Sequence, residues 1–458
     1  MFQYTNEDGL SWDTGPTLIS LPNEIISLFN DLNITVPTLL NVETGCHLNF
    51  SDGNNWYLPP GLDEVTKYFS GINSKLKNEL NEALQIASAI YNFAEKNIFY
   101  QDPPSAITLG LKSLSTGLIL KFPKLTITPY KKVIDNLFSD TNMKEFFYHF
   151  SSYVGMNPDE AQGGIISIAH VELVSPIVFP SNGVYKITES LFEKAIENNI
   201  KVNLNTEVTS AQLVNEHKIS EGWTLNIEKQ NTREKIKKDI IISNCDPFVA
   251  AYSWLRNSSI AKEFNVKIEN GVYRASESQF VILFDWFDST EISHHVKIFP
   301  ESWRLSFIDV CENYKIPNDP CIYLVWPHAT DKKISPRILF ISSMAPNNLS
   351  GIDWNLEFSF QYAENILNLC RKRLNLKFNG KIFKIITPKE LENRAHSFKG
   401  GIYSACLKKF NPVTFHNSGI TKYKNLFFVG AGVHPGAGVT MVMKSARRIA
   451  NHIIEAFK

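Results

Sequence analysis

The sequence lacks the long apolar segments by which proteins enter or cross a membrane. A transmembrane helix needs about 18 or more consecutive apolar residues, and no such run occurs. The first residues have neither the basic start nor the apolar stretch of a secretory signal peptide. We therefore expect a chain that does not span a membrane.

The chain also lacks an excess of charge of either sign. It carries 46 Lys and Arg residues against 46 Asp and Glu residues, so its formal net charge is zero. Nucleic-acid binding depends on a basic surface that releases counterions from phosphates. We therefore expect no nucleic acid as a partner.

Cysteines are few and dispersed. No C-x-x-C pair occurs, and no histidine stands at metal-ligand spacing from a cysteine. This pattern favours a reducing compartment, and so a cytoplasmic protein, and predicts no metal site. The pair His294 and His295 lies in a loop-like stretch and is expected to be solvated. The six cysteines are Cys46, Cys245, Cys311, Cys321, Cys370 and Cys406.

What the chain does have is enough apolar material for a large core. Its 458 residues are 43% hydrophobic and 12% aromatic, with 31 phenylalanines. That length exceeds what a single core usually supports, so two domains or two interleaved lobes are expected. Most of the phenylalanines are expected in an ordinary core, although such a composition could also line a long apolar cavity.

The most informative segment is residues 425–448. An apolar run leads into Gly430, Gly432, Gly436 and Gly438, and a helix-like segment follows at once. Glycine lets the backbone approach a ligand closely, and a helix N-terminus favours an anionic group. The spacing has one residue too many for G-x-G-x-x-G, and that motif occurs nowhere in the chain. The segment predicts a cofactor site.

This segment resembles the C-terminal flavin-binding signature of the bacterial-type carotenoid desaturases. That family contains phytoene desaturase and dehydrosqualene desaturase and belongs to the FAD-dependent amine-oxidase-like superfamily. Each further motif is weak alone, but together they follow the order of the family along nearly the whole chain. These motifs are residues 9–17, 155–158, 169–172, 179–185, 205–208, 243–247, 386–388 and 400–403.

The resemblance implies an α/β fold of mixed type, in which an FAD-binding Rossmann-like domain is interleaved with a substrate domain of antiparallel sheet plus helices. The FAD-binding domain would comprise residues 1–60, 165–255 and 395–458. The substrate and membrane-associating domain would comprise residues 61–164 and 256–394.

Family members begin with a strand, a G-x-G-x-x-G turn and a helix that hold the FAD pyrophosphate. This chain resembles the family only from beyond that unit. We therefore expect the N-terminal strand–helix unit of the FAD-binding domain to be missing, through truncation or a misplaced start rather than through degeneration.

The resemblance also implies which residues hold FAD. Gly436 and Gly438 would leave room for the cofactor where a Cβ would collide with it, and Val208 would present backbone groups to the adenine. His434 would either lie near the flavin or be a turn histidine satisfied by backbone groups. The full expected set is Thr14, Gly15, Pro16, Val208, Gly430, Ala431, Gly432, His434, Gly436, Ala437, Gly438, Val439, Thr440 and Met441.

The implied function is an FAD-dependent desaturase that introduces conjugated double bonds into phytoene, dehydrosqualene or a related polyene. Glu172 and Asp13 are weak candidates for the proton acceptor, since buried carboxylates near a flavin are more often structural. The alternatives are a carotenoid isomerase, a flavin-dependent carotenoid oxygenase and an inactive truncated homologue. Thr440 and Lys444 differ from the commonest forms in the family. The oligomeric state is left open.

One stretch suggests contact with a lipid surface. Residues 103–134 contain no Asp or Glu, and Ile107, Leu111, Leu114 and Leu118 fall on one face of a predicted helix. A basic amphipathic element of this kind can lie on an anionic membrane. The alternative is a surface helix docked on its own domain. With the resemblance, we expect a peripherally membrane-associated protein. The lysines of the stretch are Lys112, Lys121, Lys124, Lys131 and Lys132.

Overall fold

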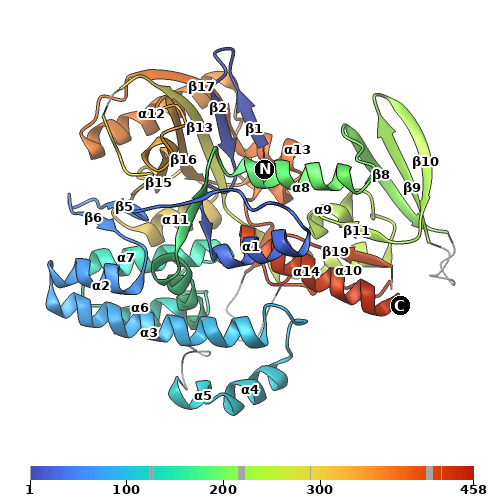
Figure 1. The fold of residues 1–458 in the computed structure, drawn as a ribbon, viewed down its shortest axis with the longest axis horizontal. Helices are drawn as coiled ribbons and strands as arrows, with labels where there is room; N and C mark the ends of the chain where they lie inside the picture. The colour runs from blue at the N-terminus through green and yellow to red at the C-terminus, as the bar shows by residue number, and fades with distance from the viewer. Residues whose placement is uncertain are drawn as a thin grey trace.

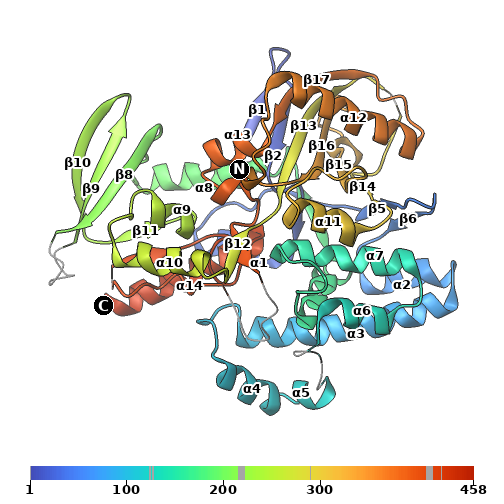
Figure 2. The same cartoon turned by 180° about the vertical axis from the view of Figure 1, so that it is seen from behind.

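The structure is a computed structural model that describes residues 2–122, 125, 128–214, 222–288, 290–408, 416–423 and 425–457. A large sheet with a helix on its outer side occupies one end of the molecule, and a layer of helices lies beneath it (Figures 1 and 2). A smaller lobe of long antiparallel strands stands apart on the other side. Within these described ranges no helix has both the length and the hydropathy that crossing a bilayer requires.

The large sheet has seven strands in the order β17-β13-β16-β15-β14-β5-β6. All neighbouring strands are antiparallel except β14 and β5, which are parallel. The strands are β5 (Cys46–Asn49), β6 (Asn55–Leu58), β13 (Ser278–Trp286), β14 (His295–Ile298), β15 (Ile322–Val325), β16 (Ile338–Ala345) and β17 (Gly380–Ile386).

The two faces of this sheet have different surroundings because alternate residues of a strand point to opposite sides. Val296, Ile298 and Leu324 lie on the face that packs against α12 (Leu356–Leu374). The alternation therefore places Lys297 and Tyr323, which are directly paired across β14 and β15, on the opposite face. We call this opposite face the inner face.

The helical layer packs against the inner face around one continuous apolar core. Its longest helix, α3 (Ser74–Asn97), begins where the Asn73 side chain accepts hydrogen bonds from two backbone N–H groups of the first turn. The other members are α2 (Leu62–Ser70), α6 (Tyr130–Leu137), α7 (Thr141–Tyr148), α11 (Trp303–Cys311), the 3₁₀ turns η2 (His149–Val154) and η3 (Gly163–Ser167), and the π-helical turn η4 (His170–Val174).

The remaining elements form the part of the molecule that carries the glycine-rich segment. Here β11 (Ile241–Ser243) and β19 (Leu426–Phe428) run parallel, and α14 (Val439–Ala456) follows β19. The neighbouring helices are α1 (Pro22–Asp31), α8 (Tyr185–Glu197), α9 (Pro247–Tyr252), α10 (Ser259–Glu269) and α13 (Pro388–Ala395).

The strands of this part form small sheets: β3 (Ile19–Ser20), β7 (Ile177–Pro180) and β4 (Leu39–Asn41) in one, and β8 (Thr206–Leu213), β9 (Trp223–Lys229) and β10 (Thr232–Lys238) in the lobe. Two pairs complete the list: β1 (Phe2–Thr5) with β2 (Ser11–Thr14), and β12 (Tyr273–Ala275) with β18 (Ala405–Leu407). The helices α4 (Ala106–Ser115) and α5 (Leu118–Lys121) project below α3.

The mixed helix and sheet architecture confirms the fold class expected from the sequence. The division into domains stays a prediction, although β5 and β6, from the expected 1–60 segment, pair with β14 of the expected 256–394 segment. The expectation for His294 and His295 is wrong. Both are almost completely buried, because they enter β14 in the middle of the sheet. Burial lowers the pKa of His295 to about 4 and that of His294 well below its ordinary range.

Candidate functional site

The glycine-rich loop lies where the carboxyl ends of two parallel strands meet. β11 leads into Asn244 and β19 leads into Gly430, and the Asn244 side chain donates a hydrogen bond of 3.2 Å to the Val429 carbonyl. In open α/β sheets, ligands bind in the crevice at the carboxyl ends of the strands. The position of this loop is therefore that of a ligand site.

Two glycines of the loop have a backbone conformation that favours glycine and would not clash through a Cβ. Gly436 and Gly438 have φ values of +128° and +110°, which side chains of L-residues rarely adopt. A Cβ on Gly436 would come no closer than 3.5 Å to another residue, and one on Gly438 no closer than 3.9 Å. The nearest side chains, His416 and Met441, lie at ordinary van der Waals distances. Gly436 is buried and Gly438 is exposed, so a ligand can approach the backbone at Gly438.

The N-terminus of α14 opens into the same loop. Its N-cap is Gly438, and no side chain caps the helix. An uncapped helix start leaves backbone N–H groups without partners in the helix and carries partial positive charge. These donors and the exposed backbone at Gly438 fit an anionic or electron-rich part of a cofactor such as FAD. Val439, Thr440 and Met441 form the first turn, and Thr440 is buried.

Other residues of the loop have structural partners. A Cβ on Gly432 would lie 2.7 Å from Pro247, so this glycine is required by packing against α9. The imidazole of His434 is buried, and its Nε2 donates a hydrogen bond of 3.0 Å to the Ile98 carbonyl. Burial lowers the pKa of His434 to about 4, so the ring is neutral and joins the loop to the end of α3. Gly430, Ala431 and Ala437 are the neighbouring residues of the loop.

The expected segment at residues 14–16 lies at the end of β2. Thr14 donates a hydrogen bond to the Phe2 carbonyl, and Gly15 is exposed with a φ of +115°. Pro16 leads to Thr17, whose hydroxyl lies 3.0 Å from that of Tyr323 on the inner face. This hydrogen bond connects the segment to the large sheet.

The adenine contact expected at Val208 would lie in the lobe. Val208 belongs to β8, next to a register shift between Val208 and Ser210, and its side chain packs against the core beneath α9. Its role toward a nucleotide stays a prediction.

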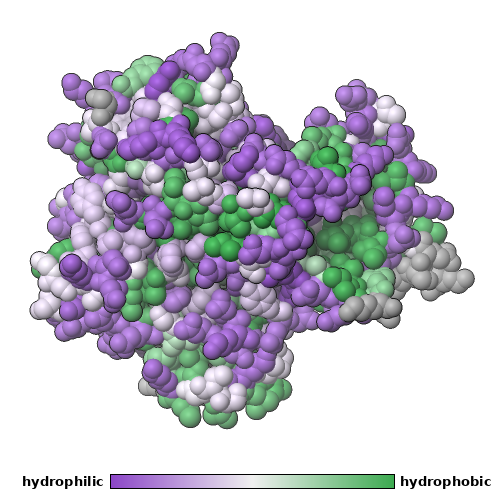
Figure 3. Space-filling model, viewed as in Figure 1, coloured by the Kyte–Doolittle hydropathy of each residue, from purple (hydrophilic) through white to green (hydrophobic). Residues whose placement is uncertain are grey.

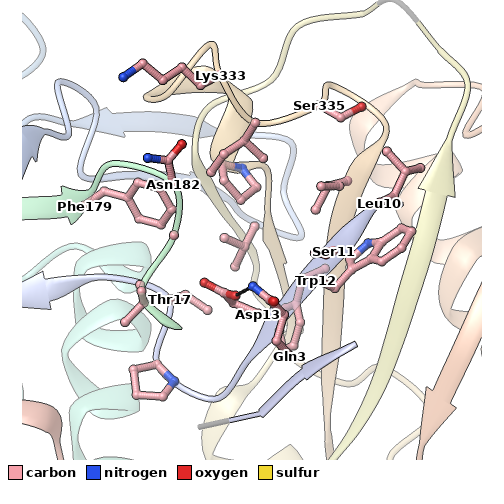
Figure 4. Close-up of a pocket in the computed structure, with 18 of the residues that line it drawn as sticks. Gln3, Leu10, Ser11, Trp12, Asp13, Thr17, Phe179, Asn182, Lys333 and Ser335 are labelled. Carbon is pink, nitrogen blue, oxygen red and sulfur yellow. Dashed lines mark hydrogen bonds between the residues drawn. The ribbon is translucent and has the colours of Figure 1, made fainter. Parts of the chain in front are cut away.

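The Asp13 carboxylate accepts hydrogen bonds from two neighbouring segments of the chain. Its Oδ2 accepts a bond of 3.0 Å from the Tyr185 backbone N–H at the start of α8, and its Oδ1 accepts one from the Gln3 side chain, drawn as a dashed line in Figure 4. Burial raises the pKa of Asp13, and these hydrogen bonds oppose the rise. This arrangement is that of a helix-capping carboxylate.

Asp13 and Thr17 also border a cavity of about 330 Å³ between β2 and the inner face. Figure 4 shows that its walls come from β2, from the Phe179–Asn182 segment and from the loop that carries Lys333. Because Thr17 both lines this cavity and contacts Tyr323, the cavity adjoins the interior region described next.

Glu172 projects from η4 toward the inner face of the sheet. Burial raises the pKa of its carboxyl group, and the nearby Lys297 ammonium opposes that rise. Burial, with Glu172 as a lesser cause, raises the pKa of Tyr153 and Tyr323 well above the ordinary range and also raises that of Tyr403. All five residues are nevertheless only partly buried. We call the region between η4 and the inner face, in which these residues lie, the inner chamber.

A second acid lies behind the chamber. Glu277 is 3% exposed, and burial raises its pKa to about 8. Its carboxylate contributes to the raised pKa of Tyr403, as Glu172 does, so that tyrosine is near both acids. Among the described residues, no group of three or more His, Cys, Asp or Glu side chains is arranged to hold a metal ion.

The structure therefore brings one of the two acid candidates into the interior and gives the other a capping position. Sequence reasoning missed Lys297, His149 and the three tyrosines of the chamber. One signal could have revealed Lys297: it is a lysine within the otherwise apolar and histidine-containing run of residues 294–299.

Comparison with curated proteins gives relatives over nearly the full length, although no protein-family model matches the chain. It is 24% identical to a 1-hydroxycarotenoid 3,4-desaturase of a Flavobacterium species, over 97% of this chain and 90% of that protein. It is also 24% identical to a 4,4'-diaponeurosporene oxygenase of Staphylococcus aureus, over 97% and 89%. A 4,4'-diapophytoene desaturase of Staphylococcus haemolyticus is 22% identical, over 98% and 90%.

Solved structures give the fold. Putrescine oxidase bound to putrescine matches with a TM-score of 0.60 and 11% identity, over 99% of this chain and 90% of that one. Cyclohexylamine oxidase from Brevibacterium oxydans matches with a TM-score of 0.56 and 11% identity, over 100% and 91%. The chain thus has the fold of these amine oxidases. The resemblance to carotenoid desaturases found in the sequence is confirmed by the curated relatives.

Proposed function

We propose that the chain is an FAD-dependent oxidoreductase that desaturates a carotenoid precursor such as phytoene, dehydrosqualene or a related polyene. The observation that carries the proposal is the glycine-rich loop at the carboxyl ends of β11 and β19, where the uncapped start of α14 lies at the exposed Gly438. The curated relatives named above support the substrate class. When bound, FAD accepts the two electrons that no side chain can take.

The residues of the chain would supply the rest of the reaction. Glu172 is the candidate proton acceptor, because a carboxylate with a raised pKa binds a proton more readily near neutral pH. Tyr153, Tyr323 and Tyr403 present aromatic rings to the inner chamber, and such flat, apolar surfaces suit a conjugated hydrocarbon and exclude water. The Tyr323–Thr17 hydrogen bond would keep the residue 14–16 segment against the chamber.

An oxygenase or an isomerase on the same fold is the alternative, since fold does not fix the reaction. The oxygenase has support of its own, because the chain is as similar to the diaponeurosporene oxygenase as to the hydroxycarotenoid desaturase.

One experiment separates these reactions. Purified protein loaded with FAD is mixed with phytoene, and separately with dehydrosqualene, without oxygen and then in air. Desaturation will bleach the flavin without oxygen and move the absorption of the polyene to longer wavelength. Isomerisation will leave the flavin oxidised and the number of conjugated bonds unchanged, and oxygenation will add oxygen to the product only in air. Protein that carries FAD and alters neither polyene would contradict the proposal.

The proposal includes peripheral association with a membrane through α4 and α5. Ile107, Leu111, Leu114 and Leu120 are between 53% and 76% exposed. These four side chains are therefore not docked on their own domain, whereas Leu109 and Leu118 pack against the end of α3. The expectation of one helix face from Ile107 to Leu118 is wrong, because α4 ends at Ser115 and Leu118 begins α5 after Gly117. Figure 3 shows hydrophobic residues gathered at the foot of the molecule, where Figure 1 places these helices. Exposed apolar side chains in a cluster mark interaction surfaces.

The electrostatic part of this attraction is smaller than the sequence suggests. Lys112 turns back to the Asn97 carbonyl, at 3.1 Å, and Lys131 forms an ion pair with Asp135. Lys121 and Lys132 are exposed, and Lys124 lies outside the described residues. Insertion of apolar side chains would therefore supply most of the binding energy, with a weaker contribution from charge.

A further inference from the structure

Lys297 is an unusual residue for a surface that would hold a hydrocarbon. It lies on β14 in the inner face, with Tyr323 as its direct neighbour on β15. Its Nζ is 2.8 Å from Nε2 of His149, and no carboxylate within the described ranges forms an ion pair with it. Glu172 is near enough for the ammonium to oppose the rise in its pKa, but the two groups do not come within 4.0 Å.

The surroundings of His149 make its ring an acceptor for a hydrogen bond from Lys297. It is 3% exposed and packs against the rings of Phe150 and Phe299, at centroid distances of 4.6 and 5.6 Å. Its Nδ1 contacts the Phe146 carbonyl, which can only accept, so Nδ1 carries the proton and Nε2 accepts from Lys297. Burial, assisted by the lysine, lowers the pKa of His149 well below its ordinary range and keeps the ring neutral.

Among the described residues, the Lys297 ammonium has more N–H donors than hydrogen-bond acceptors. It has three N–H bonds, of which His149 accepts one. The rings of Tyr153 and Tyr323 lie beside it, with centroids 5.9 and 5.5 Å from Nζ. Ring faces stabilise a cation, but they do not replace oxygen acceptors. A hydrocarbon that displaced water from the chamber would leave these N–H groups unpaired, which is unfavourable.

We propose that Lys297, oriented by His149, binds an oxygen substituent at one end of the polyene, so that the chain selects hydroxylated or carbonyl-bearing polyenes over the unsubstituted hydrocarbon. A hydroxyl or carbonyl oxygen accepts the free N–H bonds, and the conjugated chain then lies along the tyrosine rings. This inference rests on the proposed function, because it concerns the substrate of the same chamber.

The test is a binding measurement that needs no turnover. Three acyclic polyenes of equal length, one with a terminal hydroxyl, one with a terminal aldehyde and one unsubstituted, are titrated in detergent micelles against the purified chain. Quenching of tryptophan fluorescence gives the dissociation constants. Wild-type protein should bind at least one oxygenated polyene about tenfold more tightly than the hydrocarbon, a difference that corresponds to one good hydrogen bond.

Two variants test whether Lys297 causes the preference for oxygenated polyenes. In Lys297→Met the preference should fall below about twofold while hydrocarbon binding is kept or improved, and in Lys297→Gln it should be intermediate because the amide still donates. Lys75→Met is the matched control, since Lys75 lies on the exposed surface of α3. Thermal melting identifies any variant that does not fold, in which case the other variant decides.

Two results would overturn the inference alone: equal binding of all three polyenes by wild type, or a preference that survives in Lys297→Met. Binding of none of the polyenes would instead overturn the proposed function and this inference with it. Whether the hydroxyl or the aldehyde binds better identifies the oxygen group that the site takes.

Discussion

The ammonium of Lys444 lies 2.6 Å from the Glu24 carboxylate, and this contact joins α14 to α1 behind the glycine-rich loop. The Lys444 side chain is completely buried, and it also donates to the Tyr100 hydroxyl at 2.9 Å. The pKa of Lys444 is raised above its ordinary value. Burial alone would lower this pKa, but the hydrogen bonds to Glu24 and Tyr100 have the larger effect. The helix whose N-terminus opens toward the site is thus held by a buried ion pair.

Replacing Lys444 by Met should therefore destabilise the protein. The substitution leaves Glu24 without its ion-pair partner in a largely buried position, and breaking one side of a buried pair costs about 3–5 kcal/mol. Urea denaturation at neutral pH measures the change in the free energy of unfolding. Lys75→Met should change it by less than about 0.5 kcal/mol. Equal stability of Lys444→Met and wild type would show that the contact contributes nothing.

Gly436→Val and Gly438→Val should each abolish retention of FAD. A positive φ is strained for valine, and the new side chain would project from the backbone that we propose lies against the cofactor. The measurement is flavin fluorescence released on denaturing the purified protein. Gly53→Val is the matched control, because Gly53 has a φ of +88° and open surroundings far along the chain in the turn before β6. If Gly436→Val keeps as much flavin as the control, the loop does not hold the cofactor.

Glu172→Gln should lower kcat by about 10²–10⁴-fold and leave KM nearly unchanged, because the amide keeps the shape of the side chain but cannot accept a proton. Asp13→Asn should instead weaken the start of α8 and cost about 1 kcal/mol of stability. Steady-state kinetics and thermal melting of both variants compare the two acids. The reverse pattern would make Asp13 the proton acceptor.

Leu111→Glu combined with Leu114→Glu should release the protein from anionic liposomes in a sedimentation assay. Both residues are exposed on α4, so the charges would oppose insertion without disturbing the core. Salt should weaken wild-type binding only in part, since few lysines near these helices are free of partners. Leu305→Glu with Leu349→Glu, exposed elsewhere, is the control. Wild-type protein that stays in the supernatant with liposomes would contradict membrane association.

Glu277 should make the folded protein less stable as the pH rises. Its pKa is raised from 4.5 to about 8 by burial, so the folded protein keeps a proton that the unfolded chain releases. Its contribution to stability is complete below pH 4.5 and is lost as the pH rises to about 8. Relative to Glu277→Gln, the wild type should lose about 1.4 kcal/mol per pH unit across that window. Parallel unfolding free energies of the two proteins from pH 5 to pH 8 would rule this out.

Some features of this protein follow from local sequence. The loop at residues 430–438 was recognisable because an apolar strand, closely spaced glycines and a helix are encoded in one continuous segment. The resemblance of separate short motifs, in order, likewise gave the fold class and the relatives. The roles of these residues toward FAD and the division into domains stay predictions.

Only the tertiary structure decided the environment of the interior residues. His294 and His295 looked solvated, yet β14 acquires strands on both sides and a layer on each face, which no local pattern reveals. Lys297 contacts His149 and lies near Glu172, and both belong to segments more than a hundred residues away. Lys444, an exception within its motif, finds Glu24 only when α14 packs on α1. Charge and hydrogen-bonding environments depend on which distant segments a fold brings together, and a side chain therefore acquires its function only after packing.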